Sequence, residues 1–494
     1  MSEPNTNGAT HDAQALGADR PQENIKDDAF AYAPFAETVA KAVLRLPDPH
    51  GQIIAIHGPW GMGKTSFLNF VKHYLRPEHV SAEEKNQAPI VIDFNPWWFA
   101  GHEQLAGQFL AQFAAHLPKV DGRFHQIVAD LGKYARLIGT LVSVATLNPL
   151  AGNAVSAGLQ HSKTEAKDVP TLKKEIAKAL EENKQRFLVM IDDIDRLEPK
   201  EIRELFKVLK ALADFPNVIY LLAFDREVVA QSLEKELGID GNAWLEKIVQ
   251  AQFSLPKIMP EKLERKFFDD VAALLREPDG KNVTLDEDQQ RLPEWEKAYR
   301  EGLCHLIQTP RNQVRLMASL AVTYPGLRGL VNGFDFVLIE CLRIFRPAVY
   351  AALRDHYDEF ARKTETEFKN NSSTPGSNWL RKTFEQWKEK ERNSLELEAI
   401  HTLLNLLGFM CYTKDLPNSD ELKFWPEAKK FRPHNSVNDP NRFSFYFQFG
   451  VAPERKSEFV SEFKYKVHQL TPEDVADSTL SPHAEDHLLS DKTT

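Results

Sequence analysis

Eight residues near the start of the chain have the types and spacing of a phosphate-binding loop. Gly58 to Thr65 reads Gly-Pro-Trp-Gly-Met-Gly-Lys-Thr and fits the pattern G-x-x-x-x-G-K-[ST]. In such a loop, backbone N–H groups surround nucleotide phosphates, and glycines let the backbone approach closely. We expect Lys64 to contact the β- and γ-phosphates and the Thr65 hydroxyl to coordinate Mg²⁺. The predicted phosphate-binding residues are Gly58, Pro59, Trp60, Gly61, Met62, Gly63, Lys64, Thr65 and Ser66.

The segments flanking this loop have the structure that phosphate binding requires. The apolar run 53–56 before it is typical of a buried strand, and 66–75 after it carries apolar residues at helical spacing. A strand, a glycine loop and a helix therefore follow one another, and this context favours a true phosphate-binding loop over a chance match to the pattern.

Paired carboxylates follow a second apolar run, 187–191, as expected for a buried parallel strand. We expect Asp192 to hold Mg²⁺, and Asp193 to polarise the attacking water. Two acids after a strand can also simply cap its end. The phosphate loop upstream in the same polypeptide favours the catalytic interpretation.

Two further apolar runs, 89–94 and 218–224, also predict strands. The second ends at Asp225, which could sense the γ-phosphate or cap the helix that begins at residue 227. The first is followed by Trp97 and Trp98, which could be core residues.

Several segments together resemble the KAP family of P-loop NTPases. The resemblance is carried, in chain order, by 58–65, Phe94-Asn-Pro-Trp97, Ile191-Asp-Asp-Ile-Asp-Arg196, Ala223-Phe-Asp-Arg226, 245–256 and Thr309-Pro-Arg-Asn-Gln-Val-Arg315. Each motif is modest alone, but their number and order across about residues 30 to 350 make the resemblance specific. Phe94-Asn-Pro-Trp97 departs from the family's usual Phe-Asn-Ala-Trp.

The resemblance implies an arginine that stabilises transition-state charge beside the γ-phosphate. It assigns Arg311 and Arg315, four apart on a predicted helix, to this catalytic role. A solvated helix face is the alternative for this pair, and Arg196, acting across a subunit interface, is a second candidate. The resemblance also implies a role in excluding phage, with partner proteins from the same operon, a homo-oligomer, or both.

Composition narrows the possible functions. The 494 residues are 42% hydrophobic and 27% charged, with a net charge of -10, so no strong field attracts nucleic acid or anionic lipid. Three cysteines without a CxxC pair predict a reducing compartment and no structural zinc.

The uncharged segment 137–159 is long enough for a membrane span. A single span would separate the phosphate loop from the acidic strand, although both must reach one nucleotide. We therefore expect a buried or partner-facing helical hairpin, with shallow membrane contact as an alternative and spanning disfavoured. A cytoplasmic protein, in which peripheral membrane association stays open, is the expected location.

The predicted organisation is a disordered tail at 1–27, an NTPase domain at 28–330 with an apolar helical insertion at about 130–165, a mainly helical region at 331–470 and a disordered acidic tail at 471–494. Helices are expected at about 103–117, 334–346, 348–363, 379–391 and 395–413. Alternating phenylalanines from Phe443 to Phe449 predict a strand face packed on helices, with a nucleic-acid stacking platform as the alternative.

We therefore expect an α/β fold with a doubly wound parallel sheet and an α-helical C-terminal region. The expected activity is Mg²⁺-dependent ATP hydrolysis that drives or switches a protein assembly. The alternatives are a nucleotide-dependent scaffold with negligible turnover, a nucleic-acid-stimulated motor and a membrane-anchored ATPase. Adenine is favoured weakly, because no N-K-x-D guanine-reading motif is evident.

Overall fold

The computed structural model describes residues 20–99, 105–116, 169–212, 214–276, 292–355, 394–407, 436–437 and 442–447. The apolar segment 137–159, the predicted helix 379–391 and both ends of the chain, 1–19 and 448–494, lie outside these residues. Within the described parts, the chain divides into two compact units. One contains 20–269 and 308–314, and the other contains 270–307 and 315–447.

The first unit is built on a five-stranded parallel sheet with the strand order β2-β3-β4-β1-β5. Its strands are β1 (Gln52–His57), β2 (Ile90–Phe94), β3 (Phe187–Ile191), β4 (Val218–Phe224) and β5 (Ala251–Ser254). The first four match the predicted runs. The short fifth strand has no continuous apolar run in the sequence, and its residues are half-buried or exposed.

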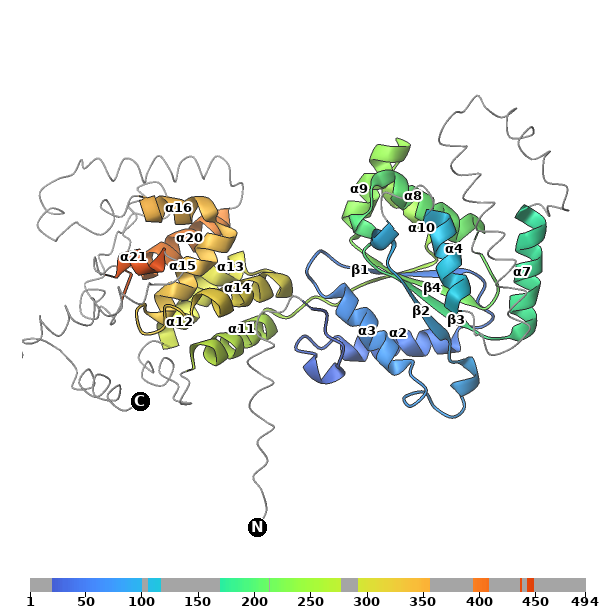
Figure 1. Ribbon diagram of the computed structural model, residues 1–494, viewed down its shortest axis with the longest axis horizontal. Helices are drawn as coiled ribbons and strands as arrows, with labels where there is room; N and C mark the ends of the chain where they lie inside the picture. The colour runs from blue at the N-terminus through green and yellow to red at the C-terminus, as the bar shows by residue number, and fades with distance from the viewer. Residues whose placement is uncertain are drawn as a thin grey trace, which may run out of the picture. The chain divides into compact units, whose positions relative to one another are not determined.

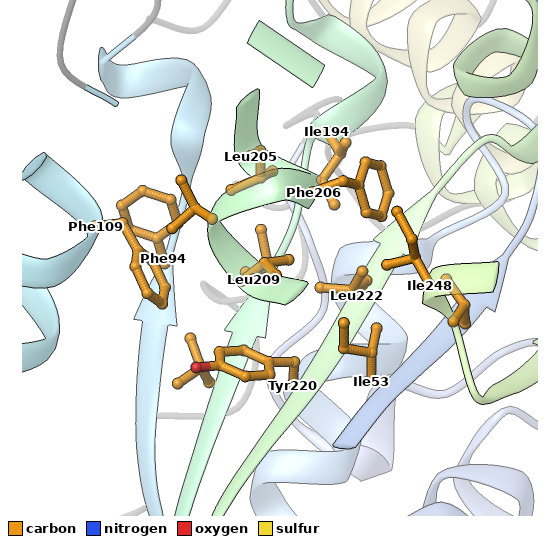
Figure 2. Close-up of a cluster of buried hydrophobic side chains, with 14 of the residues drawn as sticks. Ile53, Phe94, Phe109, Ile194, Leu205, Phe206, Leu209, Tyr220, Leu222 and Ile248 are labelled. Carbon is orange, nitrogen blue, oxygen red and sulfur yellow. The ribbon is translucent and has the colours of Figure 1, made fainter. Parts of the chain in front are cut away.

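Successive residues of the central strands point to opposite faces of the sheet, and both faces are covered. On one face, Ile54 and Ile56 pack with helices α2 (Ala33–Arg45) and α3 (Lys64–Tyr74). On the other, Ile53 and Ala55 pack with the cluster drawn in Figure 2. Because side chains on both faces of the sheet are buried, the strand sequences are continuously apolar instead of alternating between apolar and polar residues.

The helices on the second face come from several parts of the chain (Figure 1). They are α4 (Leu105–His116), α7 (Val169–Asn183), α8 (Pro199–Lys207), α9 (Arg226–Leu237) and α10 (Gly241–Ile248). Helices on both faces of a parallel sheet confirm the predicted doubly wound α/β fold. Shorter turns of helix are η1 (Ile25–Asp27), η2 (Lys85–Gln87), η3 (Pro96–Phe99), η5 (Ile194–Arg196) and the π-helical η6 (Val208–Leu212).

The second unit is helical in its described residues. Its helices are α12 (Leu292–Ala298), η7 (Tyr299–Leu303), α13 (Cys304–Leu306), α15 (Gly333–Phe345), α16 (Pro347–Asp355), α20 (Ser394–Leu406) and α21 (Phe443–Tyr446). Two more, α11 (Pro260–Leu275) and α14 (Pro310–Thr323), contribute residues to both units. Helix α15 is buried from Gly333 to Leu342, and Trp295 packs edge-on against its Phe334 with ring centroids 4.6 Å apart.

One prediction for this unit is wrong. The alternating phenylalanines were expected to form a strand, but Phe443–Tyr446 is a short helix in which Phe443 and Phe445 are both buried. The ring centroids of Phe336 and Tyr446 lie 6.2 Å apart, and the Tyr446 hydroxyl accepts a hydrogen bond from the backbone N–H of Asn332. Packing therefore explains these aromatic residues, although in a different secondary structure. Among the described helices, none is both long and apolar enough to cross a bilayer.

Candidate nucleotide-binding site

The phosphate loop joins the end of β1 to the start of α3. Gly61 and Gly63 have φ angles of 82° and 87°, in the left-handed region that favours glycine. A Cβ atom on Gly61 would lie 2.8 Å from the Cβ of Arg311, so this position also requires the absence of a side chain. Helix α3 begins at Lys64, which aims the free N–H groups of its first turn at the loop.

Lys64 is buried and is held inside the loop. Its Nζ donates a hydrogen bond to the Gly58 carbonyl at 2.9 Å and lies 3.4 Å from an oxygen of Asp195. The Asp195 side chain is 1% exposed, and the same oxygen accepts the backbone N–H of Asp225. Asp195 thus links the loop to the end of β4. Asp195 was given no role from the sequence, although it lies only three positions after Asp192; the structure places it on the one-turn helix η5.

Thr65 and Asp192, the two predicted Mg²⁺ ligands, lie in direct contact. The Thr65 hydroxyl donates to Asp192 Oδ2 at 2.5 Å across 127 positions of sequence. Burial raises the pKa of Asp192, the Thr65 hydrogen bond opposes this shift, and the neighbouring Asp193 carboxylate adds to it.

The donor set in this contact fits magnesium. Mg²⁺ prefers hard oxygen ligands and is usually held by one or two protein groups together with phosphate oxygens and water. A hydroxyl and a carboxylate in contact meet that requirement. In the described parts of the chain, no group of three or more His, Cys, Asp or Glu side chains is placed to hold a metal ion.

Asp193 is held by two neighbours. One carboxylate oxygen accepts a hydrogen bond from the side-chain amide of Asn95 at 2.9 Å, and the other lies 2.8 Å from Nε of Arg196. Asp193 itself has a φ of 59°, a left-handed conformation that is uncommon for a residue with a Cβ. Asn95 follows strand β2, and only the tertiary structure identifies it as a neighbour of this acid.

Asp225 caps helix α9. Its side chain accepts the backbone N–H groups of Glu227 and Val228, which is the capping alternative considered for this residue. Strand β4, which ends directly before this residue, lies between β1 and β3. The carboxylate therefore stands at the predicted edge of the sheet, where it serves a structural role.

The two predicted arginines have different surroundings. The Arg311 guanidinium lies 5.9 Å from the centroid of the Trp60 ring, and its backbone N–H donates to the Gly61 carbonyl at 3.3 Å. Arg315 lies over the ring of Phe345, at 5.7 Å, in the helical unit. Of these two arginines, Arg311 is therefore the one whose described interactions include the phosphate loop.

Trp97 and Trp98 are exposed, so their interpretation as core residues is wrong. Their side chains are 49% and 70% exposed because the chain turns into the one-turn helix η3 directly after β2. Another residue, Tyr32, was not identified from the sequence. It is 2% exposed, and its hydroxyl donates to the Met62 carbonyl at 2.8 Å, which ties α2 to the phosphate loop.

Comparisons with known proteins agree with this geometry. The model of the KAP family P-loop domain matches residues 32–327. The phage T7 exclusion protein of Escherichia coli K12 is 27% identical over 360 residues, which cover 68% of this chain and 47% of that protein. The chain therefore spans about half the length of this curated relative.

Solved structures show weaker likenesses. The ORC2 protein of Aeropyrum pernix, in ADPNP and ADP complexes, is 12% identical with a TM-score of 0.30, covering 68% of this chain and 83% of that one. The ORC1 protein of the same organism, in complex with DNA, is 14% identical with a TM-score of 0.31, covering 78% and 79%. At these TM-scores, we draw no conclusion from either likeness.

Proposed function

The chain belongs to the KAP family of P-loop NTPases, and on this basis we propose that it binds ATP with Mg²⁺ and hydrolyses it. The observation that carries the proposal is the contact between the Thr65 hydroxyl and Asp192 Oδ2 at 2.5 Å. It joins the residue after the P-loop lysine to the acid at the end of a neighbouring strand. These groups are the ones that P-loop NTPases use to hold the metal.

Each residue has a distinct proposed task. Lys64 binds the β- and γ-phosphates, while Thr65 and Asp192 hold the ion. When bound, Mg²⁺ would neutralise phosphate charge. Asp193 orients and polarises the attacking water. Catalysis in this scheme depends on positioning and charge, because phosphoryl transfer needs little covalent chemistry from the protein.

Arginines complete the proposed site. Arg311 contacts the phosphate loop and is the first candidate to stabilise transition-state charge. Arg315 and Arg196 are further candidates, and the Arg196 guanidinium lies beside the phosphate loop of its own chain, 5.6 Å from the centroid of the Trp60 ring. Asp225 would sense the γ-phosphate only if nucleotide binding released it from the N–H groups that it now caps.

Steady-state turnover tests the proposal. With Mg²⁺ and ATP, the wild-type chain should hydrolyse ATP, and Asp193→Asn should lower kcat about 10²- to 10⁴-fold while leaving KM nearly unchanged. Asp269→Asn is the matched control, because Asp269 is 70% exposed in an ion pair on α11. A wild type that binds ATP without turnover, alone or with partners, would contradict the enzymatic function.

A nucleotide-dependent switch with negligible turnover is the second candidate. The observation that favours it is the engagement of both Asp193 oxygens, by Asn95 and by Arg196. A carboxylate held in this way must be released before it can prepare water. Single-turnover measurements distinguish the two: a switch should form the ATP complex quickly and retain uncleaved ATP for many minutes.

We further propose that the chain acts in defence against phage, as the name of its relative, the phage T7 exclusion protein, suggests. The activity would require a homo-oligomer, protein partners from the same operon, or both, and would take place in the cytoplasm. Expression in a phage-sensitive bacterium should reduce plaque numbers, and Lys64→Ala should restore them. Equal plaque numbers with both chains, when the neighbouring genes are also present, would contradict this role.

A further inference from the structure

Two arginines and two tryptophans stack beside the phosphate loop. The Arg196 guanidinium lies 5.6 Å from the centroid of the Trp60 ring and 5.3 Å from that of Trp97, and the Arg311 guanidinium lies 5.9 Å from Trp60. We call these four residues the Arg–Trp stack. It brings together the phosphate loop, the end of β2, the turn after β3 and the start of α14.

Hydrophobic burial alone does not account for this arrangement. Trp60 is 56% exposed and Trp97 is 49% exposed, so much of each ring remains in water. A guanidinium over an indole face is attracted by the ring quadrupole, and tryptophan is the best partner for this interaction. Trp60 contacts two guanidinium groups, one contributed by the acid-bearing turn and one by α14.

A cationic group that is already held in place beside a phosphate site can bind the phosphate at a lower ordering cost. Arginine has a long, flexible side chain, and holding its planar group in place before the ligand arrives reduces the cost of ordering it. Charge that is already in position stabilises a developing anion without further reorganisation. Arg196 is restrained further by its 2.8 Å ion pair with Asp193.

We propose that Trp60 is a positioning residue whose indole holds the guanidinium groups of Arg196 and Arg311 where they recognise the terminal phosphate of a nucleoside triphosphate. The inference rests on the proposed function, because it requires a nucleotide in the phosphate loop. It has a specific consequence: loss of the Trp60 indole should weaken the binding of a nucleoside triphosphate and have much less effect on the binding of a diphosphate.

Calorimetric binding to the full-length chain tests this consequence, with Mg²⁺ and either the non-hydrolysable analogue adenylyl imidodiphosphate or ADP. Trp60→Leu should weaken analogue binding about 5- to 30-fold, since two cation–π contacts are removed, and leave ADP binding within about twofold. Trp60→Phe retains an aromatic face and should recover most of the analogue affinity. Among the described arginines, the Arg196 guanidinium is the one that lies over the Trp97 ring, so Trp97→Leu should have a smaller effect of the same kind.

Trp98→Leu is the matched control. Trp98 lies in the same short helix as Trp97 and is 70% exposed, and in the described parts of the chain no guanidinium lies over its ring. A fluorescence change on analogue binding that is present in the wild type and absent in Trp60→Phe would supply direct support from the indole itself.

The outcomes separate this inference from the proposed function. If the wild type binds both nucleotides and Trp60→Leu weakens them equally, or weakens neither, the positioning role is overturned while nucleotide binding stands. A wild type that binds neither nucleotide overturns both proposals. If the wild type binds nucleotide without hydrolysing it, the comparison of binding affinities still tests the role of Trp60, because none of these measurements requires hydrolysis.

Discussion

Replacing Gly61 by alanine combines two separate physical costs in one methyl group. The first is conformational, because the φ of Gly61 is 82°, and a left-handed residue with a Cβ costs about 1–2 kcal/mol. The second is steric. The added Cβ would lie 2.8 Å from the Cβ of Arg311 and 3.0 Å from the hydroxyl of Thr309.

The shortest of these contacts is with the Cβ of Arg311, which is fixed to the backbone. A Cβ cannot rotate away, so either the phosphate loop or the start of α14 must move. Overpacking of this kind costs about 1–3 kcal/mol, which brings the total for Gly61→Ala to about 2–5 kcal/mol. Movement of α14 would also lengthen the 3.3 Å hydrogen bond from the Arg311 N–H to the Gly61 carbonyl.

Gly238→Ala is the matched control for the conformational cost. Gly238 ends helix α9 with a φ of 66°, and a Cβ there would meet nothing within 4 Å. We expect this variant to lose about 1–2 kcal/mol, or roughly 2–8 °C in Tm, and to bind ATP as the wild type does. Gly61→Ala should lose more stability and should also bind ATP more weakly.

Thermal unfolding followed by circular dichroism and ATP binding measured by calorimetry check both expectations. If Gly61→Ala matches Gly238→Ala in Tm and the wild type in ATP affinity, the close approach of Arg311 to the loop does not exist in solution. If the two variants are equally stable but only Gly61→Ala binds ATP weakly, the start of α14 moves aside at little cost, and the steric cost calculated here is too large.

Three further variants test other contacts of the site. Burial raises the pKa of Asp192, so its carboxylate destabilises the fold increasingly as pH rises above the usual aspartate range near 3.9. Asp192→Asn should therefore raise the Tm of the nucleotide-free chain at pH 7 but not at pH 3.5, and a lower Tm at pH 7 would contradict this. Asp195→Asn leaves buried Lys64 without its carboxylate, so Tm should fall and the gain in Tm on adding ATP should exceed that of the wild type; an equal gain would show that phosphates do not replace this ion pair. Tyr32→Phe removes the hydrogen bond to the Met62 carbonyl and should cost about 0.5–1.5 kcal/mol in urea unfolding, whereas an unchanged midpoint would show that water replaces the hydroxyl.

The parallel sheet accounts for the part of the candidate site that the sequence indicated. The loop and the acids both follow apolar runs, and parallel strands bring their carboxyl ends to one edge of a sheet. Thr65 and Asp192 were therefore expected at the same edge of the sheet, although β4 lies between the strands that precede them. Their 2.5 Å contact is the structural outcome of that rule.

Local patterns were less informative where burial decides conformation. The alternation of phenylalanines after Phe443 fits a strand, but four residues form a helical turn there, because packing against neighbouring helices outweighs so short a pattern. The pair Trp97 and Trp98 looks equally suited to a core. Their exposure follows from the direction in which η3 leaves the sheet, which the side-chain types do not encode.

The sequence by itself determined the phosphate loop, the acidic strand end, the α/β class and the family, because each depends on residue types at short, fixed spacings. Only the tertiary structure decided which distant residues serve that loop. Asp195 pairs with Lys64, Asn95 holds Asp193, and Arg311 meets Gly61 across 250 positions because the folding of the sheet and of α14 brings these segments together. Such contacts depend on the relative positions of whole elements, and no local spacing in the chain records them.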